Sequence, residues 1–198
     1  RGRRRARPGP STRRRSDRGP GNTEPTTNAS ALPSGLWTLY RSRTTVTIAV
    51  KKLGFLDVAA DLAVTEGTIT VDAGGRIVQV TAAVDAASYT SGNAKRDTHV
   101  RSEDFLDADR HPEIRFTTTR VDTTGPGHRA TGVVSLKGTN TPITLDVDQV
   151  RVQGNSASFS ARATVDRGVD KMPSFIVGNK LELTISAHAT LAPATEAP

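Results

Sequence analysis

The sequence has no cysteine, which excludes disulfide bonds, thiol catalysis and cysteine-ligated zinc. Aromatic side chains are scarce, with five Phe, two Tyr and one Trp, so small apolar residues must build most of any core. No apolar run approaches the roughly 20 residues of a transmembrane helix. The stretch between Arg1 and Trp37 also lacks the apolar segment of about 7–15 residues found in secretory signals. We therefore expect a cytoplasmic protein, or a periplasmic or secreted one if the given N-terminus is incomplete.

Sequence signatures of catalysis are missing as well. There is no nucleophile elbow, phosphate-binding loop or glycine-rich dinucleotide fingerprint. The four histidines, His99, His111, His128 and His188, are too scattered for the three or four ligands of a zinc site. We expect a protein that is not an enzyme, with no catalytic residues, no metal and no cofactor.

Positive charge is concentrated at the N-terminus. Residues 1–33 hold nine arginines against Asp17 and Glu24, an excess that equals the whole formal net charge of +7. Removing these from the 27 basic and 20 acidic residues leaves 18 of each in residues 34–198, so the body is formally neutral. With five prolines and almost no apolar content, residues 1–33 cannot offset the entropy of ordering. We predict a disordered tail over 1–33, a folded domain over 34–192 and a short C-terminal tail over 193–198.

From Leu36 onward, apolar and polar residues alternate with the period of a β-strand. In one segment, for example, Val78, Val80, Ala82 and Val84 alternate with Ile77, Gln79, Thr81 and Ala83. Turn residues such as Gly125-Pro126-Gly127 separate the segments, and the short spacing favours hairpins. About eight strands with one apolar face close naturally into a small barrel. The eight clear segments are 45–50, 68–71, 77–84, 114–117, 134–137, 143–148, 157–163 and 181–186, with a weaker one at 57–64.

Residues 93–110 interrupt this alternation. Asn93 and Ser102 could each cap a short helix, and Phe105 with Leu106 would pack inward. We therefore predict an all-β fold: a closed, antiparallel, eight-stranded, lipocalin-like barrel with a short helical excursion, preceded by the disordered tail.

Two blocks of this sequence resemble the signature of the YceI-like family. The first is RDTHVRSEDFLD at residues 96–107, followed by HPEIRF at 111–116. The second is VSLKGTNTPITLDV at residues 134–147, which is similar to a strand pair of that family. Arg43 and Lys52 depart from the pattern, because family members usually have histidine there. The resemblance covers about residues 36–190.

The resemblance implies a barrel that encloses an isoprenoid-type lipid, such as a quinone or a prenyl phosphate. The alternation alone leaves open whether the barrel is hollow or filled by its own side chains. If it is hollow, we expect the ligand to be lined by Val46, Ile48, Val50, Phe55, Ile69, Val80, Phe105, Ile114, Phe116, Leu136, Leu145, Phe159 and Ile185.

Arg96, Asp97 and His99 are the residues that could meet a polar head group at the barrel mouth, since a cation there would suit a diphosphate or a quinone oxygen. The alternative is that Arg96 and Asp97 form a pair that fixes the excursion onto the barrel.

Two other functions remain open at this point. In the first, the barrel is an interaction scaffold, and the basic tail makes weak electrostatic contacts with nucleic acid or an anionic membrane. In the second, a hydrolase or isomerase uses His99 as a base on a bound lipid. A homodimer is compatible with the sequence in each case.

Overall fold

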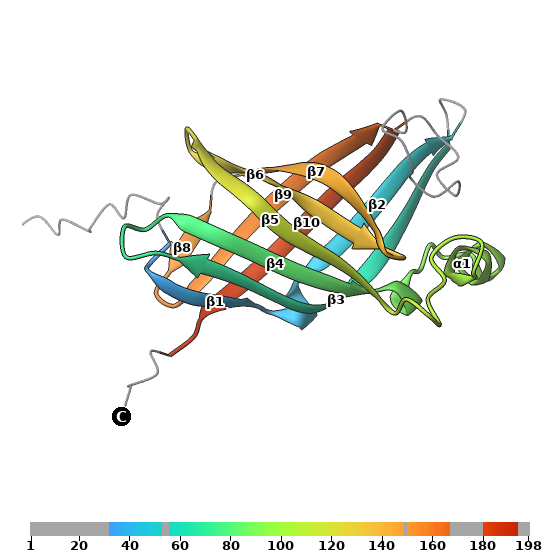
Figure 1. The fold of residues 1–198 in the computed structure, drawn as a ribbon, viewed down its shortest axis with the longest axis horizontal. Coiled ribbons are helices and arrows are strands. Elements are labelled where there is room, and N and C mark those ends of the chain that lie inside the picture. The colour runs from blue at the N-terminus through green and yellow to red at the C-terminus, as the bar shows by residue number, and fades with distance from the viewer. Residues whose placement is uncertain (1–31, 53–55, 149, 167–179, 194–198) are drawn as a thin grey trace, which may run out of the picture.

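The computed structural model describes residues 32–52, 56–148, 150–166 and 180–193. Ten strands form one antiparallel sheet that closes on itself, as predicted (Figure 1). The strands are β1 (Gly35–Leu39), β2 (Thr45–Lys52), β3 (Leu56–Val71), β4 (Ile77–Asp85), β5 (Glu113–Thr124), β6 (Gly127–Leu136), β7 (Thr139–Val147), β8 (Arg151–Gln153), β9 (Ser156–Asp166) and β10 (Lys180–Leu191).

Eight of these strands make the barrel wall. Their order is β2, β3, β4, β5, β6, β7, β9 and β10, and β10 pairs with β2 to close the ring. The predicted segments 57–64 and 68–71 belong to one long strand, β3, whose 16 residues run along the whole wall. The predicted weak and clear segments are therefore two halves of a single strand.

The two extra strands, β1 and β8, extend the wall where neighbouring barrel strands end. β1 pairs with the end of β10 and the end of β3, beyond the reach of β2. β8 pairs with the start of β9, while β7 meets β9 at only two register positions, Asp146 and Val147. Most backbone groups of the wall are thus paired along its length, which protects the strand edges.

A β-bulge changes which residues of β4 face the interior. The pairing of β3 with β4 shifts between Thr70 and Val71, so that Val71 lies opposite Ile77. Val78 is consequently 54% exposed, whereas Ile77 faces inward with Val80. The prediction that Val78 shares the inner face was wrong, because an extra residue in one strand reverses the phase of the alternation.

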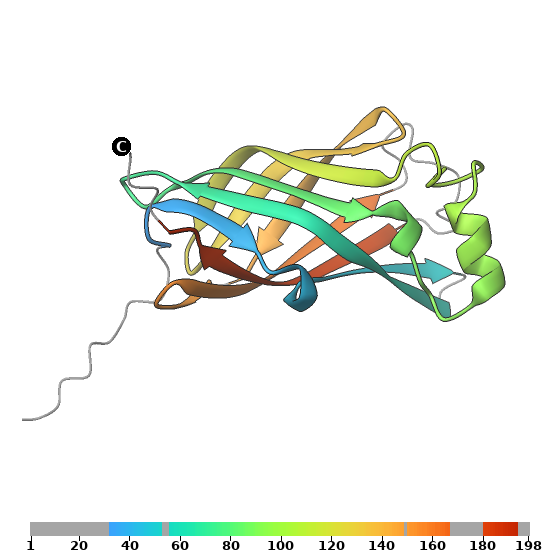
Figure 2. The same ribbon diagram turned by 90° about the horizontal axis from the view of Figure 1, so that it is seen from below.

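The helical excursion lies at one end of the barrel and packs against it through Val100, Leu106 and Ala108. Two 3-10 turns, η1 (Arg41–Arg43) and η2 (Ala86–Ser88), and one helix, α1 (Ala94–Arg101), are the helical elements of the described chain. The Asn93 side chain accepts a hydrogen bond from the Arg96 amide and caps α1, as expected. Ser102 ends this helix instead of beginning another. Figures 1 and 2 place α1 at one end and the β3–β4 turn toward the other. No described helix has the length and hydropathy of a membrane span.

The segment just before β1 packs on the barrel at the end away from α1. Leu32 is only 4% exposed and lies in the same cluster as Trp37, which is fully buried. The Trp37 indole Nε1 donates a 2.9 Å hydrogen bond to the Pro33 carbonyl. Leu32, which the prediction assigned to the tail, therefore packs in the core of the described chain. The predicted disordered tail otherwise lies outside the described residues.

Candidate functional site

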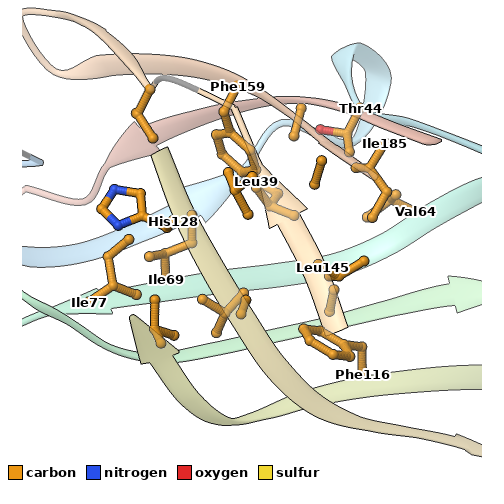
Figure 3. A pocket seen from close by; sticks show the side chains of 18 of the residues that line it. Leu39, Thr44, Val64, Ile69, Ile77, Phe116, His128, Leu145, Phe159 and Ile185 are labelled. Atoms are coloured by element: carbon orange, nitrogen blue, oxygen red, sulfur yellow. The ribbon is translucent and has the colours of Figure 1, made fainter. Parts of the chain in front are cut away.

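The barrel interior holds a cavity in the half that lies away from α1. Its volume is about 100 Å³, and its free surface is apolar (Figure 3). All eight barrel strands contribute inward-facing side chains to it, most of them small or branched, as alternation requires. The lining residues are Leu32, Leu39, Thr44, Val46, Val64, Ile69, Ile77, Val80, Ala82, Val84, Phe116, Val121, His128, Ala130, Leu145, Val147, Val150, Phe159, Ala161, Ile185 and Ala187.

Glycine makes room for bulky side chains in the wall at two places. A Cβ at position 67 would stand 2.3 Å from Leu39 Cδ1, and one at position 132 would stand 2.4 Å from the Thr117 carbonyl oxygen and 2.7 Å from the Phe116 ring. Since real Cβ atoms do not approach so closely, only glycine permits Leu39 and Phe116 to lie where they line the cavity.

The structure brings seven of the predicted lining residues together around the cavity: Val46, Ile69, Val80, Phe116, Leu145, Phe159 and Ile185. Four others, Ile48, Val50, Ile114 and Leu136, pack against the core clusters and do not line it. Phe105 lies in the excursion, where its ring meets the His99 ring edge-on at 4.6 Å. Phe55 lies outside the described residues. The interior is therefore partly filled, and the open part lies around the first seven.

The predicted head-group residues lie on the excursion, and none of them lines the cavity. Arg96 Nε donates to the Ser91 hydroxyl at 2.7 Å, and that hydroxyl donates to Asp97 Oδ1 at 2.5 Å. The Ser91 amide also donates to Asp97 Oδ1, at 2.9 Å. The Ser91 hydroxyl, followed by its amide, lowers the pKa of the Asp97 carboxyl. These bonds tie α1 to the chain that precedes it.

Two polar residues of the wall were not predicted from the sequence. Thr44 and His128 both line the cavity. The two-residue period of a strand indicates an inward orientation for each. Thr44 precedes the inward-facing Val46 by two positions, and His128 precedes the inward-facing Ala130 by two. Burial lowers the pKa of the His128 imidazole, so it is neutral at pH 7.

No charged side chain stands among the described residues that line the cavity. Nor do three His, Asp or Glu side chains gather anywhere in the described chain in a way that could hold a metal ion. The arrangement is suited chemically to enclosing an apolar group.

The sequence model of the YceI-like domain matches residues 37–189. The chain belongs to the YceI-like family. A UPF0312 protein of Serratia proteamaculans is 34% identical over 85 residues, which is 43% of this chain and 44% of that protein. Protein YceI of Escherichia coli is 30% identical over 118 residues, covering 59% of this chain and 61% of the relative. The chain thus matches about half the length of these curated relatives.

Solved structures share the barrel of this YceI-like chain. Burkholderia cenocepacia BcnA superimposes with a TM-score of 0.65 at 16% identity, covering 77% of this chain and 99% of that one. A polyisoprenoid binding domain from Saccharophagus degradans gives 0.57 at 10% identity, covering 79% and 98%. At such identities the likeness establishes the fold.

Proposed function

We propose that this YceI-like barrel binds an isoprenoid-type lipid in its cavity and carries it without chemical change. The observation that carries the proposal is the cavity itself, an uncharged, apolar space within a closed wall. The polyisoprenoid binding domain with the same fold supports it. The lipid classes that we expect are quinones and prenyl phosphates.

The energetics favour carriage. A hydrocarbon chain gains roughly 0.8 kcal/mol per CH₂ on leaving water. Measured from water, a long prenyl chain would therefore exceed the strongest known noncovalent affinities. Its real starting point is a membrane, where the chain is already dry, so transfer into an apolar barrel is nearly neutral. Near-neutral exchange is what a carrier needs.

The size of the cavity limits what this conformation can hold. An apolar protein cavity of about 150 Å³ accommodates a molecule as small as benzene. The space of about 100 Å³ seen here therefore takes only part of a long prenyl chain. We infer that the barrel widens on binding or that the remainder of the chain extends beyond the cavity.

A cavity-filling variant tests the proposal. Ala161 is 2% exposed and lines the cavity, so Ala161→Leu fills part of the space. Ala59 is exposed on β3, so Ala59→Leu adds the same atoms outside the barrel. With a short prenyl ketone as probe, we expect one-to-one binding that Ala161→Leu weakens at least tenfold and Ala59→Leu leaves unchanged. Equal binding by all three proteins would place the lipid elsewhere and contradict the proposal.

A further inference from the structure

Thr44 has an unusual environment for a hydroxyl group. The residue is 7% exposed, and its Oγ1 has no hydrogen-bond partner within the described part of the chain. It stands between η1 and β2, and its amide donates to the Arg41 carbonyl at 3.3 Å, which fixes the backbone there. Because alternate residues share a face, its side chain lies on the inner side with Val46. Figure 3 shows Thr44 in the cavity wall beside Val64 and Ile185.

A buried hydroxyl without a partner is rare, because it has given up its hydrogen bonds to water. Thr44 keeps such a hydroxyl beside Val64 and Ile185, side chains that offer no acceptor. An oxygen atom of a molecule inside the cavity would supply the missing acceptor.

His128 is the other polar side chain in the described wall. Its Nδ1 lies 3.5 Å from the Thr123 hydroxyl, on an exposed part of the strand pair, so this ring already has a polar neighbour. Thr44 is therefore the stronger candidate for recognising a ligand.

We propose that the polar end of the lipid is an uncharged oxygen acceptor, such as a ketone or quinone carbonyl, which receives a hydrogen bond from Thr44 Oγ1. This rests on the proposed function and deepens it, because it selects neutral carbonyl lipids over prenyl phosphates. A phosphate buried in this wall would face no described cation, which carries a large desolvation cost. Arg96, the arginine that the sequence suggested for a head group, is bonded to Ser91 and does not line the cavity.

Two probes of equal shape isolate the hydrogen bond. One is a short prenyl ketone, and the other is the hydrocarbon with a methylene group in place of the carbonyl. We expect the parent protein to prefer the ketone and Thr44→Val, which keeps the side-chain shape, to lose about five- to tenfold of that preference. Affinity for the hydrocarbon should stay within about twofold. Thr44→Ser, which restores a hydroxyl, should recover the preference.

Three further measurements decide the assignment. Thr65→Val removes the other buried hydroxyl without a described partner, which does not line the cavity, and should leave the preference intact. His128→Leu changes the cavity wall, so it should shift the affinity for both probes together and keep their ratio. A prenyl monophosphate of equal chain length should bind the parent more weakly than the ketone.

The inference is overturned if Thr44→Val binds both probes with the parent's ratio, if His128→Leu alone abolishes the preference, or if the phosphate binds more tightly than the ketone. In each of these cases the probes still enter the barrel and the proposed function survives. If neither probe binds the parent, the proposed function itself fails, and the inference fails with it.

Discussion

Leu39 occupies the space that a side chain at position 67 would need, with its Cδ1 and Cγ atoms 2.3 and 2.7 Å from where a Cβ would stand. Leu39 lies on β1 and Gly67 on β3, so the contact joins an extra strand to the barrel wall. Since Leu39 lines the cavity, this contact also sets the shape of the site.

Gly67→Ala should therefore destabilise the protein by about 1–3 kcal/mol through overpacking. Leu39→Ala should cost about 2–5 kcal/mol through the space it leaves. In the double variant the new methyl group enters the space that Leu39 vacates. The double variant should therefore lose less stability than the sum of the two single losses. Urea unfolding of the four proteins gives the coupling free energy, and strict additivity would show that Leu39 is not the obstacle.

The two buried threonine hydroxyls predict a gain in stability. Thr44→Val and Thr65→Val each replace a hydroxyl that has no partner among the described residues with a methyl group of similar shape. Without ligand, each variant should be more stable by about 1–2 kcal/mol, because the desolvation penalty disappears. Thermal and urea unfolding measure the difference, and exposed Thr45→Val is the matched control. A loss of stability at Thr44 would mean that its hydroxyl has a partner in solution.

His128 predicts a dependence of stability on pH. Burial lowers the pKa of its imidazole from the usual 6.5 in the folded state. Below about pH 6.5 the unfolded chain then binds more protons than the folded one, so the free energy of unfolding falls as the pH drops through this range. Between pH 7.5 and 5.5, the parent should lose more stability than His128→Leu. Parallel pH profiles for the two proteins would contradict a half-buried His128 whose neutral form is favoured.

The start of the folded domain can be tested by truncation. A chain that begins at Leu32 keeps the buried leucine and the Trp37–Pro33 hydrogen bond, and should unfold like the full chain. A chain that begins at Ser34 loses both and should be less stable by about 2–4 kcal/mol. The chain that begins at Leu32 keeps the whole described cavity lining and should still bind lipid if the barrel is the functional part. Loss of lipid binding in the chain that begins at Leu32 would favour a role for the basic tail.

Period two was enough to predict the barrel, since its inner face carries one side chain in every two. β-bulges limited how well the inward-facing residues could be predicted. The shift between β3 and β4 turned Val78 outward, and another between Thr118 and Arg120 of β5 lets Val121 face inward. Bulges depend on how two strands pair, and one strand's sequence does not reveal that pairing.

The site was predicted only in part for a related reason. Alternation assigns residues to a face, but not to a height along the barrel axis. Ile48, Val50, Ile114 and Leu136 therefore looked equivalent to Val46 and Ile69, although these four are partly buried, pack against the core clusters and do not line the cavity. Thr44 and His128 were overlooked because both lie outside the strand segments that the alternation predicts, 45–50 and 134–137. That these two residues line a cavity is visible only in the three-dimensional arrangement of the wall.

Native mass spectrometry of the purified protein, followed by organic extraction and lipid analysis, tests the central claim most directly. The account predicts a one-to-one adduct with the mass of a neutral, carbonyl-bearing prenyl lipid, either as purified or after incubation with prenyl ketones and quinones, and its loss in Ala161→Leu but not in Ala59→Leu. Detection of the protein mass alone, after incubation with prenyl ketones, quinones and prenyl phosphates, would contradict lipid carriage. Attention would then turn to the basic tail and its partners.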